Sequence, residues 1–395
     1  MSGGPAWQHP GIEPRVSRRE LLGRAAGAGA ALSLAPLLAA CGGGREAEDG
    51  AGEGPSATVR WISPSGTLDV MNDYPLWVAV ERLYFADLGI EARLSADPAG
   101  AGPAVTFVAE RRADVGYPSP GQLAKAVDGG IAIRSIWAQF PGQLFDFALP
   151  ADSTIVAVDE LEGKRIAVGA ASWAEIVDPL LVEAGVDPDS VTLVEAGADW
   201  NRTVAEGGAD AGLSWEGLRA QLAGLGLELR FLLGADFSKG PSNVYAVRSA
   251  DLDDRSGRDV YTRFLQGVVM AEEFARANPR AAAQLTYRRF PALASTITPQ
   301  VALEWMVQLA AGYGATERAG RGWGYHEPEV WAAYLRTIAE LGHTSRRLAP
   351  EDVLTNELVV PVNEDADVGF ARADGEGFEL DDDFAATTVP GDLDL

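Results

Sequence analysis

The chain has 395 residues, a formal net charge of −25, only three lysines and one cysteine. A chain this acidic offers no basic patch for phosphates, which excludes a nucleic-acid-binding role. The single cysteine excludes an intrachain disulfide. A surface adapted to salt explains the acidity more simply than a cationic ligand does.

The N-terminal 40 residues have the features of an export signal. Arg18-Arg19 precedes an uncharged apolar run over 25–40 that is too short to span a bilayer. The paired arginines indicate a twin-arginine signal, which directs export of folded proteins. Leu38-Ala39-Ala40-Cys41 resembles the lipobox of bacterial lipoproteins, in which the cysteine is lipidated; the alternative is a free or buried thiol. The sequence therefore predicts a signal peptide over 1–40 and a membrane-anchored extracytoplasmic protein, with the lipid on Cys41.

After the signal, residues 41–56 are rich in Gly, Glu and Asp and are predicted to form a flexible tether. Lobe 1 is expected to start at residue 57 and to run to 149. Strands are predicted at 58–62, 90–94, 113–117 and 131–137, and helices at 74–85, 105–110 and 120–127. This alternation predicts an α/β fold with a largely parallel sheet and helices on its faces.

The same alternation restarts in a second lobe, predicted over 150–243. Strands are expected at 162–169, 191–194, 209–213 and 228–233, and a helix at 173–183. Residues 244–362 are expected to return to lobe 1 and to be mostly helical, with several helices that have proline in the first turn. Residues 363–395 contain eleven acidic residues and one arginine, which predicts a mobile acidic tail.

Short motifs in a fixed order run through the part of the sequence that is expected to fold. They are Trp61-Ile62-Ser63-Pro64, 74–85, Leu88-Gly89-Ile90-Glu91, a loop with Gly100, Arg112-Ala113-Asp114-Val115-Gly116, 161–168, Gly208-Ala209-Asp210-Ala211 and Leu354-Thr355-Asn356-Glu357. Together they resemble the substrate-binding proteins of nitrate, sulfonate and taurine importers and of importers for thiamine pyrimidine precursors. The resemblance covers 57–360. It implies a two-lobed type II periplasmic-binding-protein fold with the ligand cleft between the lobes.

The resemblance also implies partners. Such a receptor captures a small solute, works as a monomer and delivers the solute to the permease and ATPase subunits of an ABC importer. The family also contains an enzyme, the thiamine pyrimidine synthase, which uses a cysteine cluster and consumes its own histidine. Here Asp73 falls about where that histidine would align, and the folded region has no cysteine. A lipid-anchored sensor is a third possibility. We predict no catalytic residue, cofactor or metal site, because the three histidines lack metal-ligand spacing.

Ten residues at predicted strand–helix junctions are candidates for ligand contact. They are Asn72, Asp73, Tyr74, Ser119, Trp137, Ser172, Trp173, Trp200, Trp215 and Glu216. Asn72, Asp73 and Ser119 have an alternative role as helix caps. The small residues 169–172 present N–H groups suited to an anion, or they only form a tight turn. Glu216 has an alternative role as a solvated residue at a helix start.

These candidates favour one ligand class over another. Tryptophans at loop positions suit stacking on a flat ring, and Asp73 and Glu216 offer acceptors for ring amino groups. Lysine is almost missing from the segments that form the cleft, although Arg202 and Arg219 are available. The sequence therefore favours a flat nitrogen heterocycle, such as a thiamine pyrimidine precursor or a flavin. The alternative is a sulfonate, taurine or nitrate, bound at the helix start of 170–172.

Overall fold

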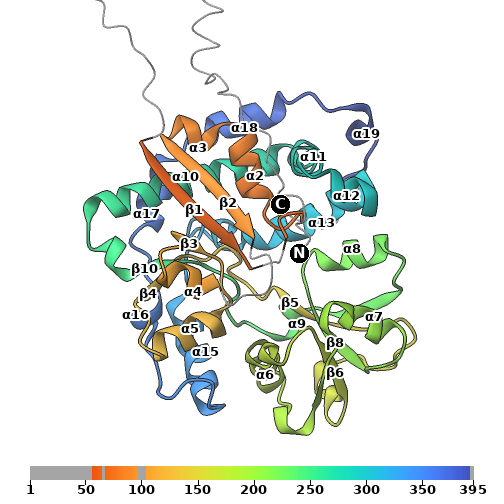
Figure 1. The fold of residues 1–395 in the computed structure, drawn as a ribbon. Helices are drawn as coiled ribbons and strands as arrows, with labels where there is room; N and C mark the ends of the chain where they lie inside the picture. The colour runs from red at the N-terminus through yellow and green to blue at the C-terminus, as the bar shows by residue number, and fades with distance from the viewer. Residues whose placement is uncertain (1–55, 65–66, 97–103, 392–395) are drawn as a thin grey trace, which may run out of the picture.

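Two five-stranded sheets form the framework of the protein in the computed structural model, which describes residues 56–64, 67–96 and 104–391 (Figure 1). The predicted signal peptide, the lipidation site Cys41 and nearly all of the tether lie outside these residues. No helix in the described ranges combines the length and apolar character needed to cross a membrane.

The sheet of lobe 1 has the strand order β2-β1-β3-β10-β4. Its strands are β1 (Ala57–Ser63), β2 (Ile90–Ala96), β3 (Val115–Gly116), β4 (Ile133–Trp137) and β10 (Tyr245–Arg248). β1 pairs in parallel with β2 and β3, whereas β10 is antiparallel to both β3 and β4. One strand of five therefore runs against the others.

The sheet of lobe 2 repeats this arrangement with the order β7-β6-β8-β5-β9. Its strands are β5 (Phe145–Pro150), β6 (Arg165–Val168), β7 (Thr192–Glu195), β8 (Ala211–Trp215) and β9 (Leu229–Leu232). Here β5 is the antiparallel strand, paired with β8 and β9. In both sheets the antiparallel strand is the first one after the chain has crossed from the other lobe.

This topology moves one predicted boundary. Lobe 1 was expected to extend to residue 149, but β5 belongs to the second sheet, so the first crossover lies between Trp137 and Phe145. The second crossover lies between β9 and β10, where the sequence predicts it. β5 of lobe 2 thus follows the first crossover, and β10 of lobe 1 follows the second.

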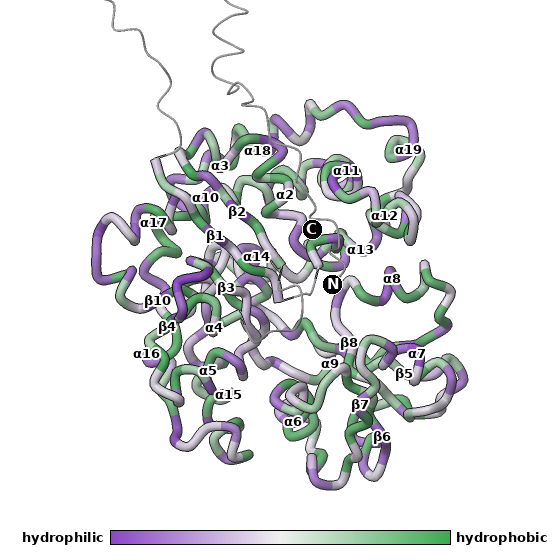
Figure 2. The backbone as a smooth tube through the Cα atoms, in the orientation of Figure 1, coloured by the Kyte–Doolittle hydropathy of each residue, from purple (hydrophilic) through white to green (hydrophobic). Residues whose placement is uncertain are grey.

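Helices flank both sheets. Lobe 1 carries α2 (Tyr74–Glu81), α3 (Tyr84–Asp87), α4 (Ala104–Ala109), α5 (Pro120–Asp128), α10 (Arg255–Ala277), α11 (Pro279–Arg289), α12 (Pro291–Thr296), α13 (Pro299–Tyr313), α14 (Ala315–Arg318), α15 (Pro328–Glu340) and α16 (Pro350–Val353). Lobe 2 carries α6 (Ala174–Glu183), α7 (Trp200–Ala205), α8 (Leu218–Gly224) and α9 (Gly234–Phe237). Apolar and polar residues alternate along these helices, as expected for helices with one buried face (Figure 2).

The C-terminal segment is not the mobile tail that its acidity predicted. Residues 359–385 form α17 (Val359–Asp365), α18 (Val368–Glu376) and α19 (Asp382–Ala385). Figure 1 shows α18 lying along α10, and α19 packs against α11 and α13. Asp374 of α18 binds Arg82, with Asp374 Oδ1 2.6 Å from Arg82 Nη2, and it also accepts a hydrogen bond from Tyr84. The acidic residues therefore serve as helix caps and ion-pair partners of an ordered segment.

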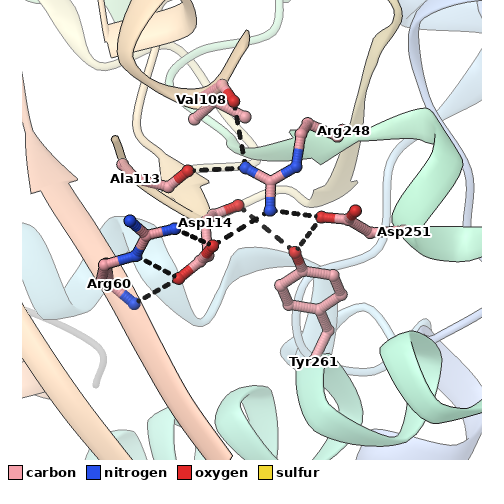
Figure 3. A network of polar contacts seen from close by, with 7 residues as sticks. All are labelled: Arg60, Val108, Ala113, Asp114, Arg248, Asp251 and Tyr261. Atoms are coloured by element: carbon pink, nitrogen blue, oxygen red, sulfur yellow. Dashed lines mark hydrogen bonds and ion pairs between the residues drawn. The ribbon is translucent and has the colours of Figure 1, made fainter. Parts of the chain in front are cut away.

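An ion-pair network links several elements of lobe 1 near the start of β3 (Figure 3). Asp114, just before β3, binds Arg60 of β1 at 2.8 Å and Arg248 of β10 at 3.0 Å. Arg248 also binds Asp251, which accepts a hydrogen bond from Tyr261 of α10. Burial raises the pKa of Asp114, but hydrogen bonds from Arg60 and Arg248 outweigh it and lower the pKa overall. The network thus links β1, β10, the residue before β3 and α10.

Candidate functional site

A cavity of about 200 Å³ lies between the two lobes. We call it the interlobe cavity. From lobe 1 it is lined by Asn72, Asp73, Tyr117, Ser119, Trp305 and Tyr313, and from lobe 2 by Phe145, Trp173, Ile176, Leu213, Trp215 and Gln221. The β1–α2, β3–α5 and β8–α8 loops follow parallel strands, so the cavity sits at the carboxyl ends of both sheets, where α/β proteins bind ligands.

Several contacts join the two lobes. Lys125 of α5 forms an ion pair with Glu175 of α6. His343 Nε2 lies 3.0 Å from Asp178 Oδ2, again across the lobe boundary. α13 packs on α8, so Trp305 reaches Gly217. These contacts describe a closed arrangement of the two lobes.

Asp73 is the only acidic side chain that lines the cavity in the described part of the chain. It stands at the N-cap of α2, yet its side chain makes no capping hydrogen bond, so the capping alternative does not explain it. It is 4% exposed, and Ser63 Oγ donates to its Oδ2 at 3.2 Å. Burial raises the pKa of Asp73 to about 7, against a smaller lowering by Ser63. The carboxyl is therefore poised to change charge near neutral pH.

Ser119 shows both of its predicted roles in position. Its Oγ accepts a hydrogen bond from Gln122 N at 3.3 Å, and Gln122 Oε1 accepts from Ser119 N, which is a complete capping box for α5. Ser119 and Gln122 also line the cavity. Because the Ser119 hydroxyl oxygen already accepts the capping hydrogen bond, we assign Ser119 first to a structural role.

Three tryptophans form the wall on the lobe 2 side. Trp173 and Trp215 line the cavity, with ring centroids 6.1 Å apart and nearly perpendicular planes. Trp200 lies behind them, stacked on Trp215 at 5.6 Å, and its Nε1 donates to Leu213 O at 2.7 Å. Trp200 therefore supports the wall without lining the cavity.

The lobe 1 wall is also aromatic, and sequence reasoning missed most of it. Tyr117, Trp305 and Tyr313 line the cavity, and the Tyr313 hydroxyl donates to Asn72 O at 2.7 Å. Trp305 is 1% exposed, and its Nε1 has no hydrogen-bond partner among the described residues. Trp305 and Tyr313 come from α13, whose sequence looks like that of any apolar helix. Only the tertiary structure brings α13 to the cavity.

Two predicted contact residues, Tyr74 and Trp137, are core residues instead. Tyr74 is fully buried, stacks on Tyr313 at 5.7 Å and donates its hydroxyl to Glu272 Oε2 at 2.5 Å. Trp137 is 2% exposed and packs against Gly324, where a Cβ would lie 2.1 Å from its ring. Neither side chain lines the interlobe cavity. Their loop positions in sequence did not reveal that their side chains point into lobe 1.

Ser172 and Glu216 also lie off the cavity. Ser172 is exposed in a short 3-10 turn, η2 (Ala171–Trp173), so this predicted anion seat does not face the interlobe cavity. Glu216 binds Arg219 at 2.5 Å, and Arg219 Nη1 lies 3.6 Å from the buried Asp146. Burial and Asp146 raise the pKa of Glu216 to about 7. Two carboxyls thus share one arginine behind the lobe 2 wall.

A serine, a histidine and an asparagine form a buried chain elsewhere in lobe 1. Ser135 Oγ lies 2.6 Å from His326 Nε2, and His326 Nδ1 lies 3.0 Å from Asn356 Oδ1. Burial lowers the pKa of His326 to about 4, which keeps the ring neutral. Ser135 and His326 are at most 1% exposed and are not part of the interlobe cavity. We therefore assign the chain to structure, since it fastens the loop before α15 to β4.

Sequence and structure comparisons place these observations among known proteins. A family model described as NMT1/THI5 like matches residues 71–282. No curated protein matches the sequence. Within the described residues, no cluster of His, Cys, Asp and Glu side chains is arranged to hold a metal ion.

Among solved structures, the chain is similar to the alkanesulfonate-binding protein SsuA from Xanthomonas axonopodis pv. citri bound to MOPS. The identity is 17%, the TM-score is 0.54, and the match covers 78% of this chain and 98% of that one. The periplasmic aliphatic sulphonate binding protein SsuA from Escherichia coli is similar at 16% identity and TM-score 0.55, covering 75% and 91%. The desulfurization enzyme DSZB is similar at 18% identity and TM-score 0.50, covering 78% and 98%. These matches confirm the predicted two-lobed periplasmic-binding-protein fold.

Proposed function

The chain belongs to the NMT1/THI5-like family, and on that premise we propose that it is the solute-binding receptor of an ABC importer. It captures one small molecule outside the cytoplasm, as a monomer, and presents it to a permease with ATPase subunits. The observation that carries the proposal is the interlobe cavity, which receives side chains from both lobes. A solute in this cavity contacts both lobes and therefore stabilises their closed arrangement. A permease can then distinguish the closed, loaded receptor from an empty one.

We propose a flat nitrogen heterocycle as the solute. Trp173 and Trp215 on one side and Trp305 and Tyr313 on the other provide rings that can stack on it. Asp73 supplies an acceptor for ring amino groups. The volume of about 200 Å³ is below the ~300–1,000 Å³ range of typical ligand sites, so it favours a single ring, such as a thiamine pyrimidine precursor, over a flavin.

A sulfonate is the second candidate, because two of the similar solved structures are sulfonate-binding proteins by title. Such an anion would depend on backbone N–H groups at helix starts, because no Lys, Arg or His lines the described cavity. A buried carboxyl in the same cavity opposes an anion. These two points make the sulfonate the less favoured solute.

An enzyme of the desulfurization or thiamine pyrimidine synthase type is the candidate from another class. The only cysteine, Cys41, lies outside the described residues, and by the family resemblance Asp73 falls about where the synthase histidine would align. Incubation of the purified protein with each solute, followed by mass spectrometry, separates the classes. A receptor returns the solute unchanged, whereas turnover would overturn the receptor proposal.

We expect Trp215→Ala to weaken binding of a ring-shaped solute about three- to tenfold, because a well-stacked ring adds about 0.5–1.5 kcal/mol. Trp200→Phe is the matched control, since it keeps an aromatic ring behind Trp215 and leaves the cavity lining intact. A thermal-shift screen of pyrimidines, pyridines and sulfonates finds the solute, and calorimetry then compares the variants. Equal losses in both variants would contradict the placement of Trp215 against the solute.

We propose that lipid on Cys41 anchors the receptor to a membrane after export through the Arg18-Arg19 signal. Two acyl chains give stable anchoring. Cys41→Ala is expected to move the protein from the membrane fraction to the soluble extracytoplasmic fraction in a bacterial host. Immunoblots of the two fractions measure this. Retention of the variant in the membrane fraction would rule out this anchor.

A further inference from the structure

The charged side chains that line the interlobe cavity are of one sign, and the lysine that lines an adjoining hollow, Lys125, is paired with Glu175. Asp73 lines the interlobe cavity, and no Lys, Arg or His does so in the described part of the chain. The two internal segments outside the described residues, 65–66 and 97–103, contain no basic residue in the sequence. Asp73 therefore has no cationic partner within the protein among the residues described here. A buried carboxylate without such a partner is costly unless something else neutralises it.

The groups that surround Asp73 do not supply the missing charge. Ser63 offers one neutral hydrogen bond at 3.2 Å. Tyr117 and Tyr245 face Asp73, and burial raises the pKa of both hydroxyls, which keeps them neutral. Glu272 lies further back, beneath Tyr74, and burial raises its pKa to about 8. Every titratable neighbour is thus either neutral or another acid.

The lobe 2 wall is backed by a second acidic site. Asp146 is completely buried and lies in β5 directly after Phe145, a lining residue. Glu216 follows Trp215, another lining residue. Both carboxyls share the guanidinium of Arg219, which lies 2.5 Å from Glu216 and 3.6 Å from Asp146. Asp146 also accepts a hydrogen bond from Gly234 N at 2.8 Å. When both carboxyls are ionised, this site carries a net negative charge behind the wall.

The remaining lining suits a positive charge as well. The faces of Trp, Tyr and Phe rings attract cations, and tryptophan does so most strongly. Trp173 and Trp215 from one lobe and Trp305, Tyr117 and Tyr313 from the other lie around the same space. Asn243 also lines it, and its Oδ1 is buried without a hydrogen-bond partner in the described residues, so it offers an acceptor.

We propose that the solute is an organic monocation, a heteroaromatic ring with a quaternary or protonated nitrogen that pairs with the Asp73 carboxylate inside the aromatic cavity. The inference rests on the proposed receptor function and specifies the charge of its solute. It differs from an uncharged aminopyrimidine, which needs only an acceptor, and it excludes sulfonates and nitrate. The cation neutralises Asp73 at the moment of capture, so an empty receptor with ionised Asp73 is the less stable form.

The test uses three probes of nearly the same shape: 1-methylnicotinamide, which is a permanent cation, nicotinamide, which is neutral, and nicotinate, which is an anion. A matched pair of N-methylated and unmethylated 4-amino-2-methylpyrimidine extends the comparison, and taurine represents the sulfonates. Calorimetry at pH 7.5 is expected to show the cation of each set bound at least about tenfold more tightly than its neutral counterpart, since the ring's positive charge attracts both the buried Asp73 carboxylate and the faces of the aromatic rings.

Asp73→Asn keeps the shape of the side chain and removes its charge. We expect the preference for the cation to disappear in this variant, while neutral rings bind as before. Glu304→Gln is the matched control: it makes the same change on α13, next to Trp305, but Glu304 contacts Gln300 and does not line the cavity. Circular dichroism and melting curves verify that each variant is folded.

The pH dependence has a defined sign. The pKa of Asp73 is raised to about 7, so protons compete with the cation below that value. Affinity for 1-methylnicotinamide should rise from pH 5 to pH 7 and then level off, and it should stay flat over that range in Asp73→Asn. A flat profile in both proteins would contradict the pairing.

The outcomes separate the inference from the proposed function. A preference for cations that is lost in Asp73→Asn supports both the charge assignment and the proposed receptor function. Preference for neutral or anionic rings overturns the charge assignment and leaves a heteroaromatic receptor. Binding of taurine alone overturns the charge assignment and the ring class together, and binding of no probe contradicts the proposed heteroaromatic specificity as well.

Discussion

Replacing Phe384 with alanine should lower the free energy of unfolding by about 3–5 kcal/mol, the usual cost of removing a buried phenylalanine ring. Phe384 is fully buried in α19, and its ring meets that of Tyr287 at 5.5 Å. The residue lies in the segment whose composition predicts a mobile tail. A mobile tail would give no effect at all, so urea denaturation of this one variant distinguishes the two descriptions.

Phe370→Ala is the control for that experiment. It removes the same ring from the same segment, but Phe370 is 39% exposed and makes an edge contact with Tyr84. We expect a loss of about 1 kcal/mol, because more than a third of Phe370 already faces water, so the substitution removes less buried area than at Phe384. Equal, small losses from both variants would mean that the C-terminal helices are not packed on lobe 1 in solution.

Changing Gly217 to alanine should weaken solute binding by roughly a hundredfold. A Cβ at Gly217 would lie 2.3 Å from Trp305 Cδ1 and 3.0 Å from Leu309 Cγ, so the lobes could not approach as closely. Overpacking of this kind costs about 1–3 kcal/mol, and the penalty falls on the closed form alone. The apparent affinity falls in proportion to the fraction of receptor that can close. If closing becomes less favourable by about 2.7 kcal/mol, that fraction and the affinity fall about a hundredfold.

Gly163→Ala controls for backbone strain. Gly163 has φ +72 and Gly217 has φ +83, so alanine is disfavoured at both, but a Cβ at Gly163 meets nothing within 4 Å. Both variants should lose some stability in melting experiments, and only Gly217→Ala should lose affinity in calorimetry. A similar affinity in the two variants would show that the contact between Gly217 and Trp305 plays no part in solute capture.

The sequence predicts the sheet elements well, since most strands in both lobes are short buried runs followed by helices with clear starts. The strand β5 is an exception. It contains Asp146 and ends in Pro150, which weakens a strand signal, and its partners β8 and β9 lie more than 60 residues later. A pairing of this kind depends on tertiary structure, and it sets the true position of the first crossover.

The C-terminal helices show how composition can mislead. Asp367 and Asp381 cap α18 and α19 by accepting hydrogen bonds from Phe370 N and Phe384 N, so these acidic residues mark helix starts. Arg288 binds both Asp381 and Asp383. In the sequence this acidic run resembles a solvated tail, because Arg82 and Arg288, which pair with it in the structure, are far away along the chain.

The candidate site was predictable only at the loops that follow strands. Asn72, Asp73, Ser119, Trp173 and Trp215 were identified from that position, and all five line the cavity. The same rule also selected Tyr74 and Trp137, because it places a residue at a strand end without giving the direction of its side chain. Trp305, Tyr313 and Asn243 were missed, since α13 and the second crossover reach the cavity only through the packing of the lobes.

A crystal structure with the most tightly bound solute of the probe panel tests the central claim most directly. We expect the solute ring inside the interlobe cavity, between Trp215 of lobe 2 and Trp305 or Tyr313 of lobe 1, next to the Asp73 carboxylate. A solute bound on one lobe alone, or outside this cavity, would contradict that claim.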